Sequence, residues 1–180
     1  MLDIDELIMP LQQDNWIDLI ADIEAAVSRR RSNVTRASFH FHNVYFMDDM
    51  TKEYAENKVD NLDLKSIPPY LHMMQHIYRS AKYTKPCEHV KCFHSTDEVL
   101  ILHNHFPIEC LSGECKSLRV PPKMGHLQHY RPDCAKTLKE QCVKEYKSVI
   151  VKDNNIWRFK DRLISRTTVV LNDLGFFWSR

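Results

Sequence analysis

The feature that most constrains the fold is a helical stripe followed closely by a strand-like run. Apolar side chains recur at i, i+3, i+4, i+7 and i+11, at Trp16, Leu19, Ile20, Ile23 and Val27. This spacing predicts an amphipathic helix that begins at a cap on Asp14 or Asn15 and ends near Arg31. Residues 34–47 (VTRASFHFHNVYFM) are rich in β-branched and aromatic side chains, which predict a strand. The chain therefore belongs to the mixed α/β class, with a mixed sheet and flanking helices.

The remaining patterns extend this α/β interpretation. We expect a strand end over residues 1–9, a charged surface loop over 48–66, a short helix with His72 and His76 after Pro68-Pro69, strands at Val99–Phe106 and Gly125–Tyr130, and helices over Cys134–Tyr146 and 156–174. Only three glycines occur in the whole chain. This scarcity excludes a glycine-rich phosphate loop of the P-loop or dinucleotide-binding type.

Length and charge narrow the class of protein. The chain has 180 residues, of which 43% are hydrophobic, so it can form one domain, or the larger part of one, with a real core. Its formal net charge of +1 argues against a nucleic-acid-binding protein, which usually has a strong basic excess. No stretch approaches the roughly 20 apolar residues that span a bilayer. We therefore expect no membrane segment and no nucleic-acid partner for this chain.

Two features indicate the secretory pathway. All six cysteines fall within one region, at Cys87, Cys92, Cys110, Cys115, Cys134 and Cys142. An even cysteine count in a short span is typical of disulfides in an oxidising compartment, although six cysteines allow 15 pairings and the sequence does not choose among them. Asn33-Val34-Thr35 is in addition a glycosylation sequon. Since the N-terminus lacks a signal pattern, we expect the chain to begin within a longer protein.

The acidic opening "LDIDEL" allows two local structures. Asp3 can cap a helix, with Glu6 at the capping-box spacing. Alternatively, Leu2 and Ile4 face a core from the end of a strand, which leaves Asp3 and Asp5 side by side on the other face. Two carboxylates about 4 Å apart repel by roughly 4 kcal/mol at an effective dielectric near 20. A divalent cation would turn this repulsion into binding, because hard ions such as manganese and magnesium prefer oxygen ligands.

Three segments carry a resemblance to a known family. "LDIDELIMP" followed by "WIDLI" resembles the "DIDEF-P…W-L" segment of glycosyltransferase family 92, which has a GT-A fold. "KCFHSTDEVLILHNHFP" with "HLQHYR" is similar to that family's "V…H-H" and "L-HYR" segments, and "IWRFKDRLISRT…LGFF" is similar to its C-terminal helix. The likeness is strongest over the first 20 residues and over 90–175. The motifs occur in the family's order, which makes the resemblance fairly specific.

The resemblance implies a metal-dependent, inverting transfer of galactose from UDP-galactose to an acceptor glycan. Asp3 and Asp5 would form the D-x-D motif that ligates Mn²⁺ or Mg²⁺, and the UDP-sugar would be the donor. GT-A enzymes often add a histidine ligand from the C-terminal part. His105 is the first candidate and His129 the second, while His103 shares a face with His105.

The same resemblance suggests further roles. Arg131 and Lys91 could contact diphosphate oxygens, for which arginine offers bidentate geometry. An inverting transfer needs a base, and Asp48 and Asp49 are placed for it directly after the aromatic strand. Aromatic platforms for the acceptor sugar could come from Tyr45, Phe46 or Trp157.

The position of the D-x-D motif bears on domain organisation. In a GT-A domain the uridine-binding strands and helices precede this motif, which stands here at residues 3–5. We therefore expect residues 1–180 to be a single, N-terminally truncated GT-A catalytic domain, running from the D-x-D motif to the C-terminus. The full-length protein would be a single-pass membrane protein of the Golgi lumen.

Two alternatives stay open at the level of sequence. The chain could be an inactive glycosyltransferase fragment. It could also be a non-enzymatic zinc-binding module, because Cys87-x4-Cys92 and Cys110-x4-Cys115, with His103 and His105 between them, supply the ligand types that zinc prefers.

Overall fold

The computed structural model of the chain describes residues 2–28, 35–57, 64–85 and 91–176. The strands are β1 (Glu6–Pro10), β2 (Ser38–Phe41), β3 (Asn43–Met47), β4 (Tyr78–Ser80), β5 (Lys91–His94), β6 (Val99–Leu102), β7 (Pro107–Cys110), β8 (Ser117–Arg119), β9 (Gly125–Arg131) and β10 (Ile150–Lys152). The helices are α1 (Trp16–Ser28), α2 (Asp48–Asn57), α3 (Lys139–Cys142) and α4 (Lys160–Asp173). Shorter helical turns are η1 (Leu64–Ser66), η2 (His72–Gln75), η3 (Lys136–Leu138), η4 (Val143–Lys147) and η5 (Asn155–Phe159). The mixed α/β class predicted from the sequence is confirmed.

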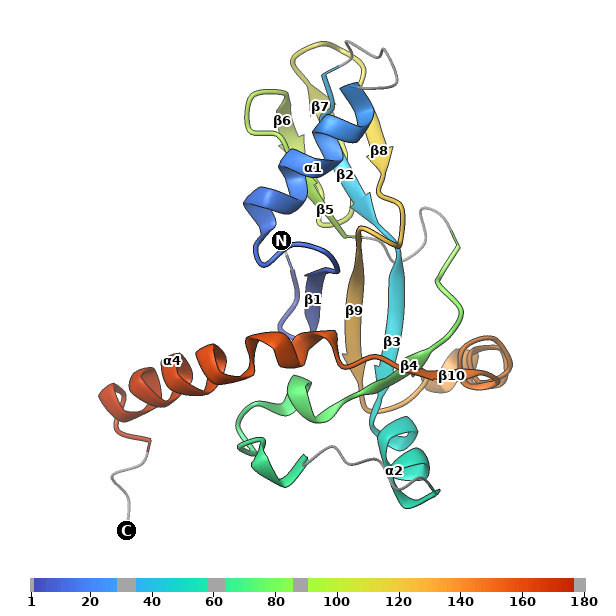
Figure 1. The fold of residues 1–180 in the computed structure, drawn as a ribbon. Helices are drawn as coiled ribbons and strands as arrows, with labels where there is room; N and C mark the ends of the chain where they lie inside the picture. Colours follow the sequence, from blue (N-terminus) through green and yellow to red (C-terminus); the bar gives the residue numbers. More distant parts are fainter. Residues whose placement is uncertain (1, 29–34, 58–63, 86–90, 177–180) are drawn as a thin grey trace.

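A three-stranded sheet in the order β1-β9-β3 forms the centre of the molecule (Figure 1). The middle strand β9 pairs antiparallel with β1 and parallel with β3. Glu6 and Tyr45 are both registered with His129. The first residues of β1 therefore lie at the same edge of the sheet as the carboxyl ends of β9 and β3.

A second sheet, in the order β5-β2-β8, lies beside α1 (Figure 1). Leu19 and Ile23 are the buried residues of α1, and they pack in one core cluster with Phe39 and Phe41 of β2. The predicted amphipathic helix is confirmed, although its expected end near Arg31 lies outside the described residues. The single strand expected over 34–47 is instead two strands, since the chain passes from β2 of one sheet to β3 of the other.

The C-terminal part packs below the central sheet. Trp157 of η5 donates its indole N–H to the carbonyl oxygen of Met74 at 2.8 Å, which ties the start of the last helix to the η2 segment. In Figure 1, α4 continues from this point away from the sheet. None of its residues is fully buried. In the part of the chain that the structure describes, no helix combines the length and the apolar character needed to cross a bilayer.

Three element predictions require correction. The expected loop over 48–66 begins with helix α2, because acidic residues at its first turn favour the positive end of the helix dipole. The strand expected over Val99–Phe106 ends at Leu102, where a turn leads back into β7. The helix expected from Cys134 begins at Lys136, as the short turn η3 followed by α3 and η4.

Two disulfides join neighbouring cysteines. Cys110 pairs with Cys115, and Cys134 with Cys142. Cys92 is a buried free thiol whose pKa is raised by burial to about 11. Cys87 and the sequon residues Asn33 and Val34 lie outside the described residues. Because thiolates are the zinc ligands, a disulfide between Cys110 and Cys115 removes half of the proposed cysteine set, and the zinc module built on it is wrong.

Candidate functional site

The D-x-D segment lies in a turn that leads into β1. The Glu6 N–H donates to the carbonyl oxygen of Asp3 at 3.1 Å, and the Glu6 carboxylate accepts from the Asp3 N–H at 3.0 Å. The Ile4 side chain is 98% exposed. Both local alternatives are therefore wrong: no helix begins at Asp3, and Ile4 points to solvent rather than to a core. Glu6 does reach back as in a capping box, but it closes a turn before a strand.

Lys91, the first residue of β5, holds two of the acids. Its ammonium nitrogen lies 3.0 Å from Asp3 Oδ2 and 3.2 Å from Glu6 Oε2. The side chains of Lys91 and Glu6 are buried, whereas Asp3 is largely exposed. The hydrogen bond from Lys91 lowers the pKa of Asp3 below its ordinary value. Strand β5 thus places the Lys91 ammonium beside the acidic turn, although Lys91 follows Glu6 by 85 residues in the sequence.

His129 of β9 stands against the other side of the same acids. Its Nε2 lies 3.3 Å from Asp5 Oδ2 and its Nδ1 lies 3.8 Å from Glu6 Oε1. Burial lowers the pKa of His129, although the charges of Glu6 and Asp5 oppose this shift. Among the described residues, the buried Nδ1 atom has no hydrogen-bond partner. A neutral imidazole beside carboxylates presents the donor set that a cation requires.

The other predicted site residues lie farther from the acidic turn. His105 is close enough for its charge to lower the pKa of Asp3. His103 stacks on Phe106 instead, with ring centroids 4.7 Å apart. Arg131 follows His129 by two residues on β9, and its charge further lowers the pKa of His129. Direct contacts therefore join Asp3 to Lys91 and Asp5 to His129, while His105 and Arg131 act on these residues through their charge.

The proposed aromatic platforms are packed inside the protein. The Tyr45 ring lies 5.6 Å from that of His129, and burial raises the pKa of its hydroxyl, an effect that a hydrogen bond from Arg131 opposes. Phe46 is fully buried and stacks on Tyr130. Trp157 is half-buried and donates to Met74. Core packing accounts for all three contacts, so an acceptor role for them stays a prediction.

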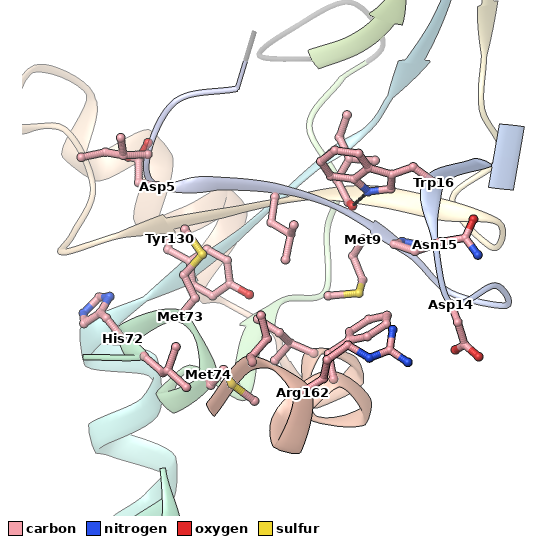
Figure 2. Close-up of a pocket in the computed structure, with 18 of the residues that line it drawn as sticks. Asp5, Met9, Asp14, Asn15, Trp16, His72, Met73, Met74, Tyr130 and Arg162 are labelled. Carbon is pink, nitrogen blue, oxygen red and sulfur yellow. Dashed lines mark hydrogen bonds between the residues drawn. The ribbon is translucent and has the colours of Figure 1, made fainter. Parts of the chain in front are cut away.

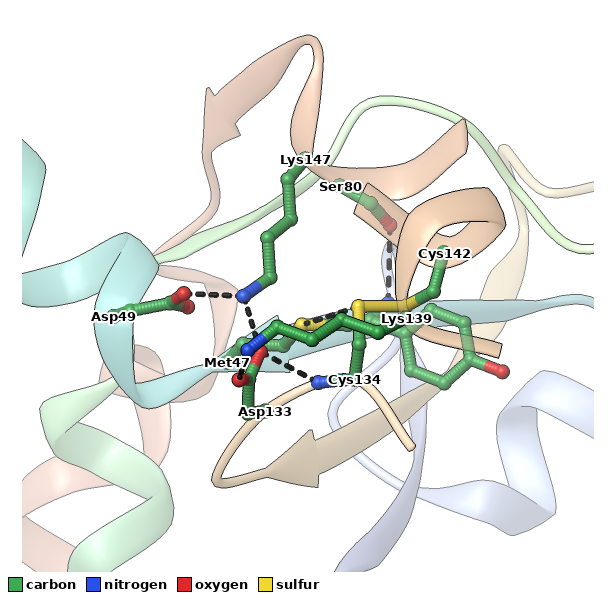
Figure 3. Close-up of a disulfide and its surroundings, with 9 residues drawn as sticks. Met47, Asp49, Ser80, Asp133, Cys134, Lys139, Cys142 and Lys147 are labelled. Carbon is green, nitrogen blue, oxygen red and sulfur yellow. Dashed lines mark hydrogen bonds and ion pairs between the residues drawn. A yellow bond between two sulfur atoms is a disulfide. The ribbon is translucent and has the colours of Figure 1, made fainter. Parts of the chain in front are cut away.

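Asp48 and Asp49 have separate partners at the start of α2. Asp48 Oδ1 lies 2.8 Å from His76 Nε2. Asp49 forms an ion pair with Lys147, which also contacts Asp133 at 2.5 Å beside the Cys134–Cys142 disulfide (Figure 3). Hydrogen bonding from Lys147 lowers the pKa of Asp133 to about 2. The Asp49 carboxylate is thus part of an ion-pair network with Lys147 and Asp133.

A mostly apolar groove of about 1010 Å³ extends from Asp5 of the D-x-D turn to His72 at the start of η2. It extends along β1 between η2 and α4, and both Asp5 and His72 line it (Figure 2). Trp16 closes part of this surface by donating its indole N–H to the Ile8 carbonyl oxygen at 2.8 Å (Figure 2). A ligand in the groove can therefore approach the D-x-D turn and the start of η2 together.

Sequence reasoning missed two contributors to this region. The sequence pattern indicates only a capping role for Glu6, yet its buried carboxylate links Lys91 to His129. A third acid directly after the D-x-D motif, at the start of an apolar strand, was the available signal. His76 was placed on a short helix without a partner, because its contact with Asp48 joins residues 28 positions apart.

Comparison with known protein families gives a match over most of the chain. Residues 1–167 match the family model described as Glycosyltransferase family 92. No curated protein and no solved structure matches the chain.

Proposed function

Since the chain belongs to glycosyltransferase family 92, we propose that its reaction is a metal-dependent, inverting transfer of galactose from UDP-galactose to an acceptor glycan. The observation that carries this proposal is that Asp5 and Glu6 lie against His129, while Asp3 shares Lys91 with Glu6, at one edge of the central sheet. A bound cation and an anionic donor substrate would explain why these carboxylates and His129 lie at one edge of the sheet.

The donor atoms suit Mn²⁺ or Mg²⁺. Asp3 and Asp5 offer exposed carboxylate oxygens, which are the hard ligands that these ions prefer. His129 adds an imidazole whose Nε2 lies 3.3 Å from Asp5 Oδ2. We therefore assign the ion to Asp3, Asp5 and His129, with His105 as a further candidate ligand. When bound, the ion would neutralise the charge that develops on the departing diphosphate.

Lys91 and Arg131 take different roles in this proposal. The Lys91 ammonium is buried between Asp3 and Glu6, so it positions the acidic turn and is not placed to meet a ligand directly. Arg131 stands at the carboxyl end of β9, half-buried, beside His129. Its guanidinium could bind diphosphate oxygens in a bidentate manner. Arg131 is accordingly our candidate for orienting the nucleotide.

For the catalytic base we favour Asp48 over Asp49. An inverting transfer needs one group that accepts the proton of the acceptor hydroxyl. The Asp49 carboxylate is already engaged in an ion pair with Lys147. Asp48 adjoins His76 and His72, and His72 lines the groove. The acceptor would therefore approach along the groove toward Asp48.

The test is donor turnover by the full chain with UDP-galactose, Mn²⁺ and a set of sugar acceptors. We expect release of UDP to require Mn²⁺ and to fall at least about a hundredfold in Asp5→Asn, because one electrostatic ligand is lost. Asp97→Asn, which removes an exposed carboxylate away from the site, should match the wild type. Equal turnover by Asp5→Asn and the wild type would contradict the proposal. Inversion is checked by the anomeric configuration of the product, measured by NMR.

We further propose the Golgi lumen as the compartment. Two disulfides support this location, because such bonds persist in the oxidising secretory pathway. Localisation of the tagged full-length protein by fluorescence microscopy tests it. Cytosolic staining would contradict the proposal.

A further inference from the structure

Beyond the D-x-D group, a second cluster of metal-ligating side chains lies at the junction of α2 and η2. Asp48, His72 and His76 each offer one ligand atom, and these three atoms lie within 4.8 Å of one another. His72 lines the groove with a side chain that is 62% exposed, Asp48 is half-buried, and His76 is buried. Two imidazoles and one carboxylate are a ligand set used by zinc sites that keep an open position.

The hydrogen bonding of His76 fixes which nitrogen can bind. Its Nδ1 lies 3.0 Å from the carbonyl oxygen of His72. A carbonyl oxygen only accepts, so Nδ1 must carry the hydrogen. In the neutral ring the lone pair is then on Nε2, which faces Asp48 Oδ1 at 2.8 Å. Two lone pairs at this distance repel unless a cation, either a proton or a metal ion, lies between them or beside them.

This arrangement is the one that orients a metal-binding histidine. Ligating histidines almost always donate their other ring N–H to a carbonyl or carboxylate, which fixes the tautomer and the ring direction. The backbone of η2 supplies this support for His76, and the Tyr130 ring packs nearly perpendicular to the imidazole, with ring centroids 5.7 Å apart. The first ligand is thus preorganised before any ion binds.

The distances suit a small ion of the zinc class. Two ligand atoms with zinc bonds near 2.0–2.1 Å lie about 3.3 Å apart at a tetrahedral angle. The Asp48–His76 separation is 2.8 Å, and His72 Nε2 lies 3.9 Å from the same carboxylate oxygen. The first separation is about 0.5 Å too short and the second about 0.6 Å too long for zinc. Small rotations of the half-buried Asp48 and the exposed His72 side chains would correct both. Imidazole nitrogens also favour zinc over the hard ions that suit the D-x-D group.

We propose that Asp48, His72 and His76 form a binding site for Zn²⁺ or a similar borderline transition-metal ion, separate from the D-x-D group. Three protein ligands leave the fourth position to water on the groove side, where His72 is exposed. While this ion is bound, the Asp48 carboxylate is not able to accept a proton. The binding itself does not depend on the proposed reaction, although this consequence does.

The experiment is a calorimetric titration of the full chain with Zn²⁺ alone. It is performed in an Asp5→Asn background, so that the D-x-D group does not contribute. We expect one equivalent to bind, and His72→Ala and Asp48→Asn each to weaken the affinity by at least about tenfold, since removal of outer-shell partners alone costs this much. The matched controls His103→Ala and Asp97→Asn remove an exposed imidazole and an exposed carboxylate elsewhere, and should leave the affinity unchanged.

Two outcomes would overturn the proposal. If no Zn²⁺ binds, a proton alone joins Asp48 to His76. If Zn²⁺ binds equally well to His72→Ala and to Asp48→Asn, the ion occupies other ligands. His72 is exposed, so His72→Ala should fold even if Asp48→Asn does not, and circular dichroism of each variant checks this. Because the readout is binding, failure of the transferase proposal would leave these results unaffected.

Discussion

Replacing Lys91 with methionine tests whether a buried ion pair holds the acidic turn. The Lys91 side chain is 1% exposed and that of Glu6 is 4% exposed, with 3.2 Å between ammonium and carboxylate. Removing one partner of a buried pair leaves the other charge uncompensated, which costs about 3–5 kcal/mol. The pair with Asp3, whose side chain is 59% exposed, adds at most about 1 kcal/mol. We therefore expect Lys91→Met to lower the free energy of unfolding by about 4 kcal/mol.

Urea and thermal unfolding measure this loss. For a chain of this size, 1 kcal/mol shifts Tm by about 2–4 °C, so the variant should melt at a temperature lower by roughly 8–16 °C. The matched control is Lys82→Met, because Lys82 pairs with Glu145 at 2.9 Å but is 52% exposed. An exposed pair of this kind contributes little to stability, so Lys82→Met should leave Tm nearly unchanged. The double variant Lys91→Met/Glu6→Gln should recover much of the stability, since it leaves no unpaired buried carboxylate.

Two results would refute this reasoning. Lys91→Met could prove no more destabilising than Lys82→Met, which would mean that water reaches the Glu6 carboxylate. Alternatively, the effects of Lys91→Met and Glu6→Gln could simply add in the double variant. Additive effects would mean that the two side chains do not interact.

The other predictions concern stability elsewhere in the chain. Replacing both Cys134 and Cys142 with serine should lower the free energy of unfolding by about 2.5 kcal/mol, as the loss of a short covalent loop predicts, and urea unfolding would show no change if the bridge does not form. Burial lowers the pKa of His126 to about 4, so the unfolded chain takes up its proton first as the pH falls. Stability should therefore decline from about pH 6.5 to pH 4 by up to about 1.4 kcal/mol per pH unit, and His126→Gln should flatten this slope in urea titrations. Arg158 donates to the carbonyl oxygens of Pro10, Leu11 and Gln13, so Arg158→Lys, which keeps the charge but loses the fork, should cost about 1.5–3 kcal/mol by thermal melting.

Local pattern was sufficient for much of the fold. The stripe from Trp16 predicted α1, and the run from Gly125 predicted the central strand β9, because both signals depend on near neighbours in the sequence. The prediction of one strand over 34–47 was wrong, because the composition of the run is the same whether the chain forms one strand or passes at His42 from β2 to β3. That the chain forms one domain stays a prediction.

The candidate site was likewise only partly predictable from the sequence. The resemblance suggested Asp3, Asp5 and His129 as ligands of one ion, and the structure places Asp5 against His129 and Asp3 against Lys91. That the three residues bind an ion together stays a prediction. The role of Lys91 as a buried partner of Glu6 could not be predicted, since it depends on how β5 packs against the turn before β1. The Asp48–His76 contact likewise joins two elements whose relative position no local pattern contains.

The most direct test of the central claim is electron paramagnetic resonance of Mn²⁺ bound to the full chain. If Asp3, Asp5 and His129 hold the ion, the bound Mn²⁺ should show coupling to one imidazole nitrogen. His129→Ala should abolish this coupling, and Asp5→Asn should weaken binding. Mn²⁺ that binds with no nitrogen coupling, or with equal affinity to Asp5→Asn and the wild type, would contradict the account.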